Sequence, residues 1–572
     1  MTIPHMPNAG LSPLADIAVQ LVGAANVLAA LDVEFGAAVN RLAELCAPAG
    51  KLDGQLLDVH QWACYELAFC HAELCASRLL IEGGAGGRAL DRALGLAFVA
   101  EAARSALTRL EGIYLATGLD PALLIPVQTS ADMLALRRDA GGAGHLAALG
   151  VAVCANEEEL GDVALGEQAT IARDTFRRFA ADVVAPLAQD IHRHDLTVPE
   201  SLLGPMRKMG VFGLSIPEQY GGFAPAGGDN TPLMIAVTEA LSEASLAAAG
   251  SLITRPEILA RALLAGGTEA QKVQWLPRLA NGDPLCAIAI TEPDFGSDAA
   301  GLQLRGTKTE GGWLLDGAKT WCTFAGKAGV LMVVVRTDPD RTLGHRGLSL
   351  LLVEKPSFDG HAFVFQQERG GVVEGRAIPT VGYRGMHSFD LTFDNVFVPD
   401  ANVIGESEGL GRGFYLTMAG MTGGRIQTAG RALGVMRAAI RAACAYAQER
   451  KVFGSALIDF PLTGVKIAQM AARFIACRKL AYAVGRQMDE GGGQMEASLA
   501  KLLACRCAEL VTREAQQIHG GMGYAEEMVV SRFWVDARVL SIFEGAEETL
   551  ALKVVARGLI ERAQALDIAT SR

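Results

Sequence analysis

The spacing of hydrophobic positions changes along the chain and divides it into four regions. Residues 1–155 are rich in alanine and leucine at intervals of three or four, as at Leu67, Cys70 and Leu74, which predicts amphipathic helices. Helical spacing continues through residues 156–283. We therefore expect an extra N-terminal helical domain followed by a second helical domain.

The third region, residues 284–400, has a different pattern of apolar residues. It contains short runs of branched or alternating apolar residues at 331–336, 347–354 and 389–397, which predict β-strands. Gly311 and Gly312 predict a hairpin turn. Long amphipathic helices return in residues 401–572. The pattern predicts a mainly α protein with a central β domain (α+β), and it disfavours a Rossmann sheet because strands and helices do not alternate.

Glycine clusters at 454–464, 491–493 and 520–523 predict breaks between the C-terminal helices. Another cluster, the sequence GAGGRA at 84–89, imitates a dinucleotide-binding loop. It follows a helical segment, whereas a dinucleotide loop follows a strand. An interhelical turn is therefore the favoured interpretation.

Composition limits the possible functions. The chain has 572 residues, of which 50% are hydrophobic and 20% charged, so it can bury a large core and form three or four domains. A formal charge of −12 disfavours nucleic acid as a partner. The eleven cysteines are odd in number and scattered, which argues against a secreted disulfide framework. The group Cys64, Cys70, His71 and Cys75 lacks the close cysteine pair of a zinc site, so we expect buried thiols on a helix face and no metal.

The first residues of the chain indicate where in the cell the protein is expected. No lysine or arginine precedes Arg41, so a secretory signal and a transit peptide are not expected. The apolar run 17–31 is interrupted by Gln20 and Asn26 and is too short to span a bilayer. We expect a soluble, cytoplasmic protein without a membrane partner.

Five short segments carry the candidate chemistry, and they occur in a characteristic order. They are ITEPDFGSD at 290–298, DGAKTWCT at 316–323, RKVFG at 450–454, QIHGGMGY at 517–524 and SIFEGAEE at 541–548. Together they resemble the signature sites of the acyl-CoA dehydrogenases, over roughly residues 160–567. The resemblance implies an N-terminal helical domain, a β-barrel-like domain and a C-terminal four-helix bundle, to which the extra helical domain is added.

The resemblance implies that Glu544 is the catalytic base. A thioester α-proton is weakly acidic, so hydrogen-bond donors must polarise the carbonyl where enolate charge develops. The resemblance assigns this role to the backbone N–H of Glu544 and a ribityl hydroxyl of FAD, with the β-hydride passing to flavin N5. Outside this context, Glu544 would be interpreted as an acid at a helix N-terminus. Some family members carry the base at a position that aligns with Gly424, which has no carboxylate.

The resemblance also implies an FAD site. Thr291 and Thr323 would hydrogen-bond the flavin ring, Trp321 would pack on it, and Ser297 would lie near phosphates. Residues of one subunit would reach the FAD of its neighbour, so we expect a homodimer or homotetramer. The full set of expected FAD-binding residues is Ile290, Thr291, Gly296, Ser297, Trp321, Thr323, Arg450, Phe453, Gln517, Gly520 and Gly521.

For the acyl group, the N-terminal extension and the last motif resemble a member that oxidises a short, branched chain ending in a carboxylate. Arg255 falls on the segment expected to line the acyl tail, and either a carboxylate-binding or a surface arginine fits it. Arg425 is expected near the CoA moiety, or in an ion pair. Ser297 and Gly545 complete the expected substrate contacts. An electron-transfer flavoprotein is the expected electron acceptor.

Three rival functions share these motifs. Another short-chain acyl-CoA dehydrogenase or an acyl-CoA oxidase would use the same base and flavin. A catalytically inactive assembly protein on the same fold is the non-enzyme alternative, which the intact Glu544, Thr291 and Trp321 disfavour.

Overall fold

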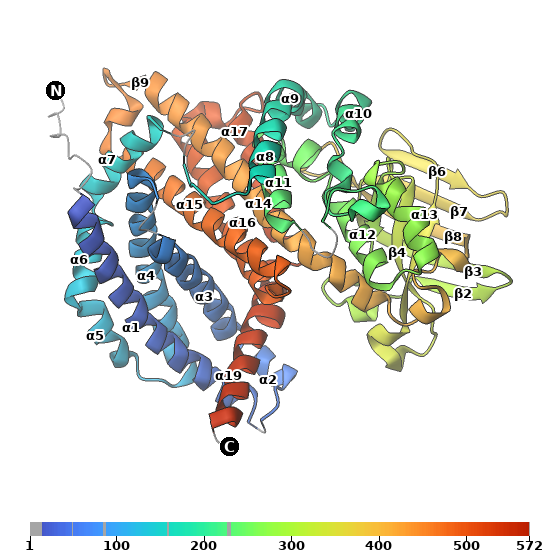
Figure 1. The fold of residues 1–572 in the computed structure, drawn as a ribbon, viewed down its shortest axis with the longest axis horizontal. Helices are drawn as coiled ribbons and strands as arrows, with labels where there is room; N and C mark the ends of the chain where they lie inside the picture. Colours follow the sequence, from blue (N-terminus) through green and yellow to red (C-terminus); the bar gives the residue numbers. More distant parts are fainter. Residues whose placement is uncertain (1–13, 49, 84–86, 157–159, 226–229, 571–572) are drawn as a thin grey trace. The chain divides into compact units, whose positions relative to one another are not determined.

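The computed structural model describes residues 14–48, 50–83, 87–156, 160–225 and 230–570 (Figure 1). The chain forms two compact units. The first comprises Met1–Gly166, Ala432–Gln487 and Gly492–Arg572, and the second comprises Glu167–Arg431 and Met488–Gly491. Segments from both ends of the chain therefore build the first unit.

Among the described residues, seven α-helices form the N-terminal part of the first unit, coloured blue to cyan in Figure 1. They are α1 (Leu14–Cys46), α2 (Gly54–Val59), α3 (Gln61–Glu82), α4 (Ala89–Thr117), α5 (Ile125–Thr129), α6 (Ala131–Asp139) and α7 (Ala143–Cys154). The predicted helical spacing is confirmed on α3, where Leu67, Cys70 and Leu74 are all fully buried. α1, α3 and α4 pack against one another. This part is the predicted extra helical region.

α1 is longer than the apolar run suggested. Ile17–Cys46 is the single helix among the described residues that is long and apolar enough to cross a membrane. The helices of soluble cores pass the same test, and α1 buries Val27, Leu31 and Leu42 along one face. The expectation that the protein lacks a membrane partner stays a prediction.

The C-terminal part of the first unit is also helical. It contains residues 432–449 of α14 (Gly413–Glu449), then α15 (Pro461–Asp489), α16 (Gln494–Ile518), α17 (Val529–Arg538), α18 (Glu547–Leu550), a π-helical segment Ala551–Ala556 and α19 (Arg557–Thr570). α3 packs beside α16 (Figure 1). The glycine breaks predicted at 491–493 and 520–523 are confirmed, because both lie outside helices α15 to α17.

Gly464 is an exception to the predicted helix breaks. It lies inside α15, and a Cβ atom there would stand 2.6 Å from the carbonyl oxygen of Ala147 on α7. Gly150 approaches from the other side, since its own Cβ would stand 2.0 Å from the Gly464 oxygen. This glycine therefore permits close packing of α7 on α15, a role that glycine spacing alone does not distinguish from a helix end.

The second unit begins with helices. They are α8 (Glu167–Phe179), α9 (Ala185–Arg193), α10 (Glu200–Lys208), α11 (Thr231–Ala244), α12 (Thr254–Gly266) and α13 (Glu269–Ala280). α13 starts at a capping box, in which Thr268 and Gln271 each accept the backbone N–H of the other. Residues 413–431 of α14 also belong to this unit.

The sheet of the second unit has eight strands in the order β1-β4-β2-β3-β8-β7-β6, with β5 also paired to β4. The strands are β1 (Cys286–Ala289), β2 (Arg305–Thr309), β3 (Gly312–Thr323), β4 (Val330–Arg336), β5 (Leu348–Glu354), β6 (Ala362–Gln366), β7 (Val372–Ala377) and β8 (Ser388–Pro399). β4, β5 and β8 confirm the three predicted strands. Gly311 lies in the β2–β3 hairpin turn with φ +71°, which confirms that turn. The predicted α+β class is confirmed.

Two minor predictions concern loops and thiols. Residues 84–86 of the dinucleotide-like loop lie outside the described residues. Cys64, Cys70, His71 and Cys75 all lie on α3, and Cys64 and Cys70 are buried. Among the described residues, the one His, Cys and carboxylate group close enough to hold a metal is Asp195, His361 and His387. The Nε2 atom of His361 lies 3.0 Å from the Asp195 carbonyl oxygen, and that of His387 lies 3.0 Å from Asp195 Oδ1. The expectation that the protein holds no metal stays a prediction.

Candidate active site

The proposed base lies on a short loop of the first unit. Glu544 follows the 3₁₀ turn Val539–Ser541 and precedes α18. Its φ is +53°, in the left-handed region that non-glycine residues rarely adopt, and Gly545 follows with φ +100°. Such backbone strain persists only where surrounding contacts impose it, and it concentrates at functional sites. The structure therefore gives Glu544 a backbone state that a simple helix-capping acid does not need.

A buried lysine holds this loop. Lys501 of α16 is 1% exposed and donates from Nζ to the carbonyl oxygens of Phe543, at 2.8 Å, and Gly545, at 2.5 Å. These carbonyls flank Glu544 on both sides. The charged donor therefore restrains the strained turn through charge-assisted hydrogen bonds. Sequence reasoning missed Lys501, because nothing in the sequence of α16 indicates which loop the amine reaches.

The expected flavin loop lies in the second unit, directly after β1. Glu292 anchors it: its carboxylate accepts the N–H groups of Gln303, at 2.7 Å, and Leu304, at 2.8 Å. Lys319 of β3 donates to the same carboxylate at 2.8 Å and to the Ile290 carbonyl at 2.9 Å. The Lys319 side chain is fully buried. Sequence reasoning singled out neither member of this pair, although both lie inside the quoted motifs.

The residues expected to face the flavin lie close in sequence to this pair: Thr291 precedes Glu292, and Trp321 and Thr323 follow Lys319. The N–H of Thr320 donates to the Thr291 carbonyl at 2.9 Å, which joins the loop to β3. Trp321 lies at a register shift between β3 and β8, with φ +57°, and the residue is 55% exposed. Thr323, two residues further along β3, is buried, and its hydroxyl oxygen lies within hydrogen-bond distance of the Ser388 hydroxyl oxygen, at 3.0 Å. An exposed indole could pack on the face of a flavin ring, and nearby hydroxyl groups could hydrogen-bond its polar edge.

Gly296 and Ser297 lie on the exposed part of the same loop, and Ile290 begins it. A Cβ at Gly296 would meet only Thr291, at 4.0 Å, so the space above the loop is open. These residues are placed where a bound phosphate could approach the backbone.

The residues expected to contact a neighbouring subunit's FAD are exposed. Phe453 sits in the tight turn between β9 (Lys451–Val452) and β10 (Ser455–Ala456), with φ +50°, and is 95% exposed. Arg450 directly precedes this hairpin and is also exposed. A strained turn that presents a phenylalanine to solvent is typical of a contact surface.

A second set of these residues lies at the end of α16. Gln517 is exposed in its last turn, and Gly520 follows with φ +59°. Nothing lies within 4 Å of a Cβ built at Gly520 or Gly521. A ligand can therefore approach this backbone closely.

The two arginines expected to bind substrate belong to the second unit. Arg255 of α12 is 6% exposed, so its interpretation as a surface arginine is wrong. Its Nη1 donates to the Ser251 carbonyl at 3.0 Å and to the Tyr383 hydroxyl at 3.2 Å. Arg425 lies on α14 and is half-buried. Gly424, the position at which some family members carry the catalytic base, is buried on the same helix.

Comparison with known proteins defines the family. Sequence models of the acyl-CoA dehydrogenase N-terminal, middle and C-terminal domains match residues 166–283, 287–396 and 411–560. A (2S)-methylsuccinyl-CoA dehydrogenase from Cereibacter sphaeroides is 43% identical over 69% of this chain and 70% of its own. An acyl-CoA dehydrogenase from Bacillus subtilis (strain 168) is 35% identical over 67% of this chain and 95% of its own. This chain belongs to the acyl-CoA dehydrogenase family.

Solved structures agree with this assignment. Butyryl-CoA dehydrogenase from Megasphaera elsdenii aligns with a TM-score of 0.64 and 30% identity, covering 70% of this chain and 99% of its own. A glutaryl-CoA dehydrogenase from Mycobacterium smegmatis, solved in complex with FADH2, aligns with a TM-score of 0.60 and 26% identity, covering 69% of this chain and 95% of its own. As an acyl-CoA dehydrogenase, the protein is an FAD flavoprotein and an oxidoreductase acting on CH–CH bonds of acyl-CoA substrates. The three matched domains begin at residue 166, so helices α1 to α7 precede them.

Proposed function

We propose that this acyl-CoA dehydrogenase oxidises (2S)-methylsuccinyl-CoA to mesaconyl-CoA, a step of the ethylmalonyl-CoA pathway. The observation that carries the substrate assignment is the 43% identity to a (2S)-methylsuccinyl-CoA dehydrogenase, against 35% for the Bacillus subtilis acyl-CoA dehydrogenase. The buried Arg255 adds a chemical reason, because this substrate ends in a carboxylate.

In the proposed reaction, Glu544 removes the α-proton of the bound acyl thioester. Its backbone N–H donates to the thioester carbonyl and stabilises the enolate charge that develops there. FAD, when bound, accepts the β-hydride. The strained loop and the Lys501 contacts serve this chemistry by holding the carboxylate and the N–H in one orientation.

We propose that Arg255 binds the terminal carboxylate of the substrate. A buried guanidinium is costly unless its hydrogen bonds are satisfied, and it pairs well with a carboxylate. The Tyr383 hydroxyl beside it, at 3.2 Å from Nη1, supplies a second polar group. We assign Arg425, Ser297 and Gly545 to contacts with the CoA and thioester parts.

The first experiment is anaerobic flavin absorbance of the purified protein during addition of (2S)-methylsuccinyl-CoA. We expect rapid bleaching in the parent protein and none in Glu544→Gln, with equal FAD content in both. If butyryl-CoA bleaches the flavin and (2S)-methylsuccinyl-CoA does not, the substrate assignment is wrong. Undiminished bleaching in Glu544→Gln would refute the base assignment.

The Arg255 assignment has its own test, in which the substrate provides the control. Replacing the charged donor by Arg255→Gln removes a charge-assisted hydrogen bond worth about 1.5–3 kcal/mol, which corresponds to a KM increase of roughly 10- to 150-fold. The KM for butyryl-CoA, which has no terminal carboxylate, should change less than about twofold. Equal increases for both substrates would instead indicate a structural role.

We further propose that an electron-transfer flavoprotein reoxidises the enzyme. A structure described as the electron transferring flavoprotein of Acidaminococcus fermentans contains a chain that aligns with 28% identity and a TM-score of 0.62. An acyl-CoA oxidase would instead pass electrons to oxygen, so stoichiometric peroxide during turnover in air would favour the oxidase.

Oligomerisation completes the proposal. We assign Arg450, Phe453, Gln517, Gly520 and Gly521 to the FAD of a neighbouring subunit in a homodimer or homotetramer. The 95% exposure of Phe453 supports such a contact. A monomeric holoenzyme in size-exclusion chromatography with light scattering would refute it.

A further inference from the structure

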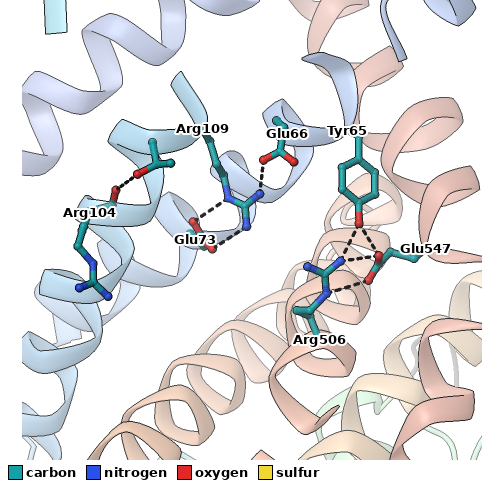
Figure 2. Close-up of polar contacts among 8 residues, drawn as sticks. Tyr65, Glu66, Glu73, Arg104, Arg109, Arg506 and Glu547 are labelled. Atoms are coloured by element: carbon teal, nitrogen blue, oxygen red, sulfur yellow. Dashed lines mark hydrogen bonds and ion pairs between the residues drawn. The ribbon is translucent and has the colours of Figure 1, made fainter. Parts of the chain in front are cut away.

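A closed set of hydrogen bonds joins the N-terminal helices to the segment that follows the catalytic loop. The Tyr65 hydroxyl of α3 donates to Glu547 Oε1 at 2.5 Å, and Arg506 Nη2 of α16 donates to the same oxygen at 2.6 Å (Figure 2). Arg506 Nη2 also donates to the Tyr65 hydroxyl oxygen at 2.7 Å. Each member of this triad therefore contacts both others, although Tyr65 and Glu547 are 482 positions apart.

The surroundings hold Tyr65 and Arg506 in these positions. The Arg506 guanidinium lies over the Phe69 ring, 4.6 Å from its centroid, and the Tyr65 and Phe69 rings lie 5.1 Å apart. Figure 2 shows Arg109 of α4 between Glu66 and Glu73, with which it forms ion pairs. The Phe69 ring therefore lies between two guanidinium groups, since Arg109 stands 5.3 Å from its centroid, and these contacts restrain Arg506.

The protonation states favour the contacts seen. Burial and the Glu547 carboxylate raise the pKa of Tyr65 to about 12, so the phenol stays a donor at physiological pH. Burial alone would lower the pKa of Arg506, but the hydrogen bond and charge of Glu547 raise it above its ordinary value. Tyr65 and Arg506 therefore both keep the protons that they donate to Glu547 at physiological pH.

Glu547 is three residues beyond Glu544 and is the first residue of α18. Closer to Glu544 in sequence, Lys501 donates hydrogen bonds to the carbonyls of Phe543 and Gly545. The catalytic loop therefore has two anchors: the Lys501 amine at its centre and the Tyr65–Arg506 pair at its end. Both Lys501 and Arg506 project from α16, whereas Tyr65 comes from α3.

We propose that Tyr65 and Arg506 are positioning residues for the dehydrogenation, so that the N-terminal helices take part in catalysis by holding the Glu544 loop through Glu547. The inference rests on the proposed role of Glu544. The strained φ of Glu544 gives the physical reason, because a left-handed glutamate relaxes unless both ends of its loop are held. A displacement of about 1 Å at a reacting group can cost roughly 100-fold in rate.

The test uses anaerobic stopped-flow flavin reduction by the acyl-CoA that bleaches the parent protein, in full-length holoenzyme variants. We expect Tyr65→Phe to slow the reduction rate constant by about 3- to 10-fold and Glu547→Gln by at least about 10-fold, with KM within about twofold of the parent. The α-deuterium isotope effect should increase in both, because proton removal becomes more rate-limiting. The double variant should be no slower than Glu547→Gln alone, since both changes break one network.

Tyr114→Phe is a matched control. Tyr114 of α4 donates to Glu34 Oε2 at 2.7 Å, so this variant also loses a tyrosine–carboxylate hydrogen bond among the N-terminal helices, far along the chain from Tyr65. We expect a comparable drop in thermal midpoint but an unchanged reduction rate constant. Equal slowing in Tyr114→Phe and Tyr65→Phe would overturn the proposal, because general loosening of the domain would then explain both.

Two other outcomes separate this inference from the proposed function. If Glu544→Gln abolishes reduction while Tyr65→Phe and Glu547→Gln stay within about twofold of the parent, the positioning role is wrong and the base assignment stands. If Glu544→Gln still reduces the flavin, the base assignment is wrong and the positioning role falls with it.

Discussion

Glu292→Gln is the substitution that best tests how the flavin loop is built. The carboxylate receives the N–H groups of Gln303 and Leu304 and the Lys319 ammonium, and both charged side chains are buried. Glutamine offers one acceptor oxygen in place of two, so one backbone N–H must lose its partner. The variant also leaves the Lys319 charge without its carboxylate.

The magnitude follows from these contacts. Removing one partner of a buried ion pair costs about 3–5 kcal/mol, and the unsatisfied N–H is part of that cost. At roughly 2–4 °C per kcal/mol for a domain of about 150–250 residues, the thermal midpoint of the second unit should fall by about 6–20 °C. FAD should be lost at lower temperature, since Thr291 adjoins Glu292.

The pH dependence of the variant has a definite sign. Burial already lowers the pKa of Lys319, and Glu292 opposes that shift. Without the carboxylate the pKa of Lys319 falls further, so the folded state binds fewer protons than the unfolded state between that lowered pKa and the ordinary lysine pKa of 10.5. Stability of the variant relative to the parent should therefore recover as the pH rises from 7 toward 10.

The assay is thermal unfolding followed by flavin fluorescence, which reports FAD release, beside circular dichroism. Glu269→Gln is the control: its carboxylate is 69% exposed and accepts from the Tyr220 hydroxyl at 2.8 Å. An exposed contact of this kind contributes less than about 1 kcal/mol. If both variants shift the midpoint equally, the buried pair does not hold the loop.

Three further predictions test other parts of the molecule. Lys501→Met keeps the length of the stem but removes the loop contacts, so flavin reduction in stopped flow should slow by at least about 10-fold while FAD content is retained; an unchanged rate constant would contradict the anchoring role. Burial lowers the pKa of His71 to about 4, so stability conferred by the neutral imidazole is complete above pH 6.5 and decreases by up to about 3 kcal/mol as the pH falls toward 4. Denaturant titrations at several pH values should show this slope in the parent and not in His71→Gln. Gly464→Ala should lower the thermal midpoint because its Cβ would meet the Ala147 oxygen, whereas Gly36→Ala, inside α1 with nothing within 4 Å, should raise it slightly; equal shifts would contradict the packing argument.

Much of the architecture was predictable because it depends on local patterns. Helical spacing predicted the buried face of α3, and runs of branched apolar residues predicted β4, β5 and β8. The motifs around Thr291, Trp321 and Glu544 predicted the family, which the comparisons confirm. Gly464 shows the limit of local reasoning: a glycine at a helix end and a glycine at a close helix contact look alike in sequence.

The order of helices and strands, the types of the reacting residues and the family all follow from local sequence, since they depend on neighbours within a few positions. The contacts that hold the reacting residues in place could be seen in the folded chain alone. Lys501 reaches a loop more than 40 positions away, and Tyr65 reaches Glu547 across 482. Such contacts depend on how helices pack, and packing is set by side-chain shape over the whole core, which no short motif encodes.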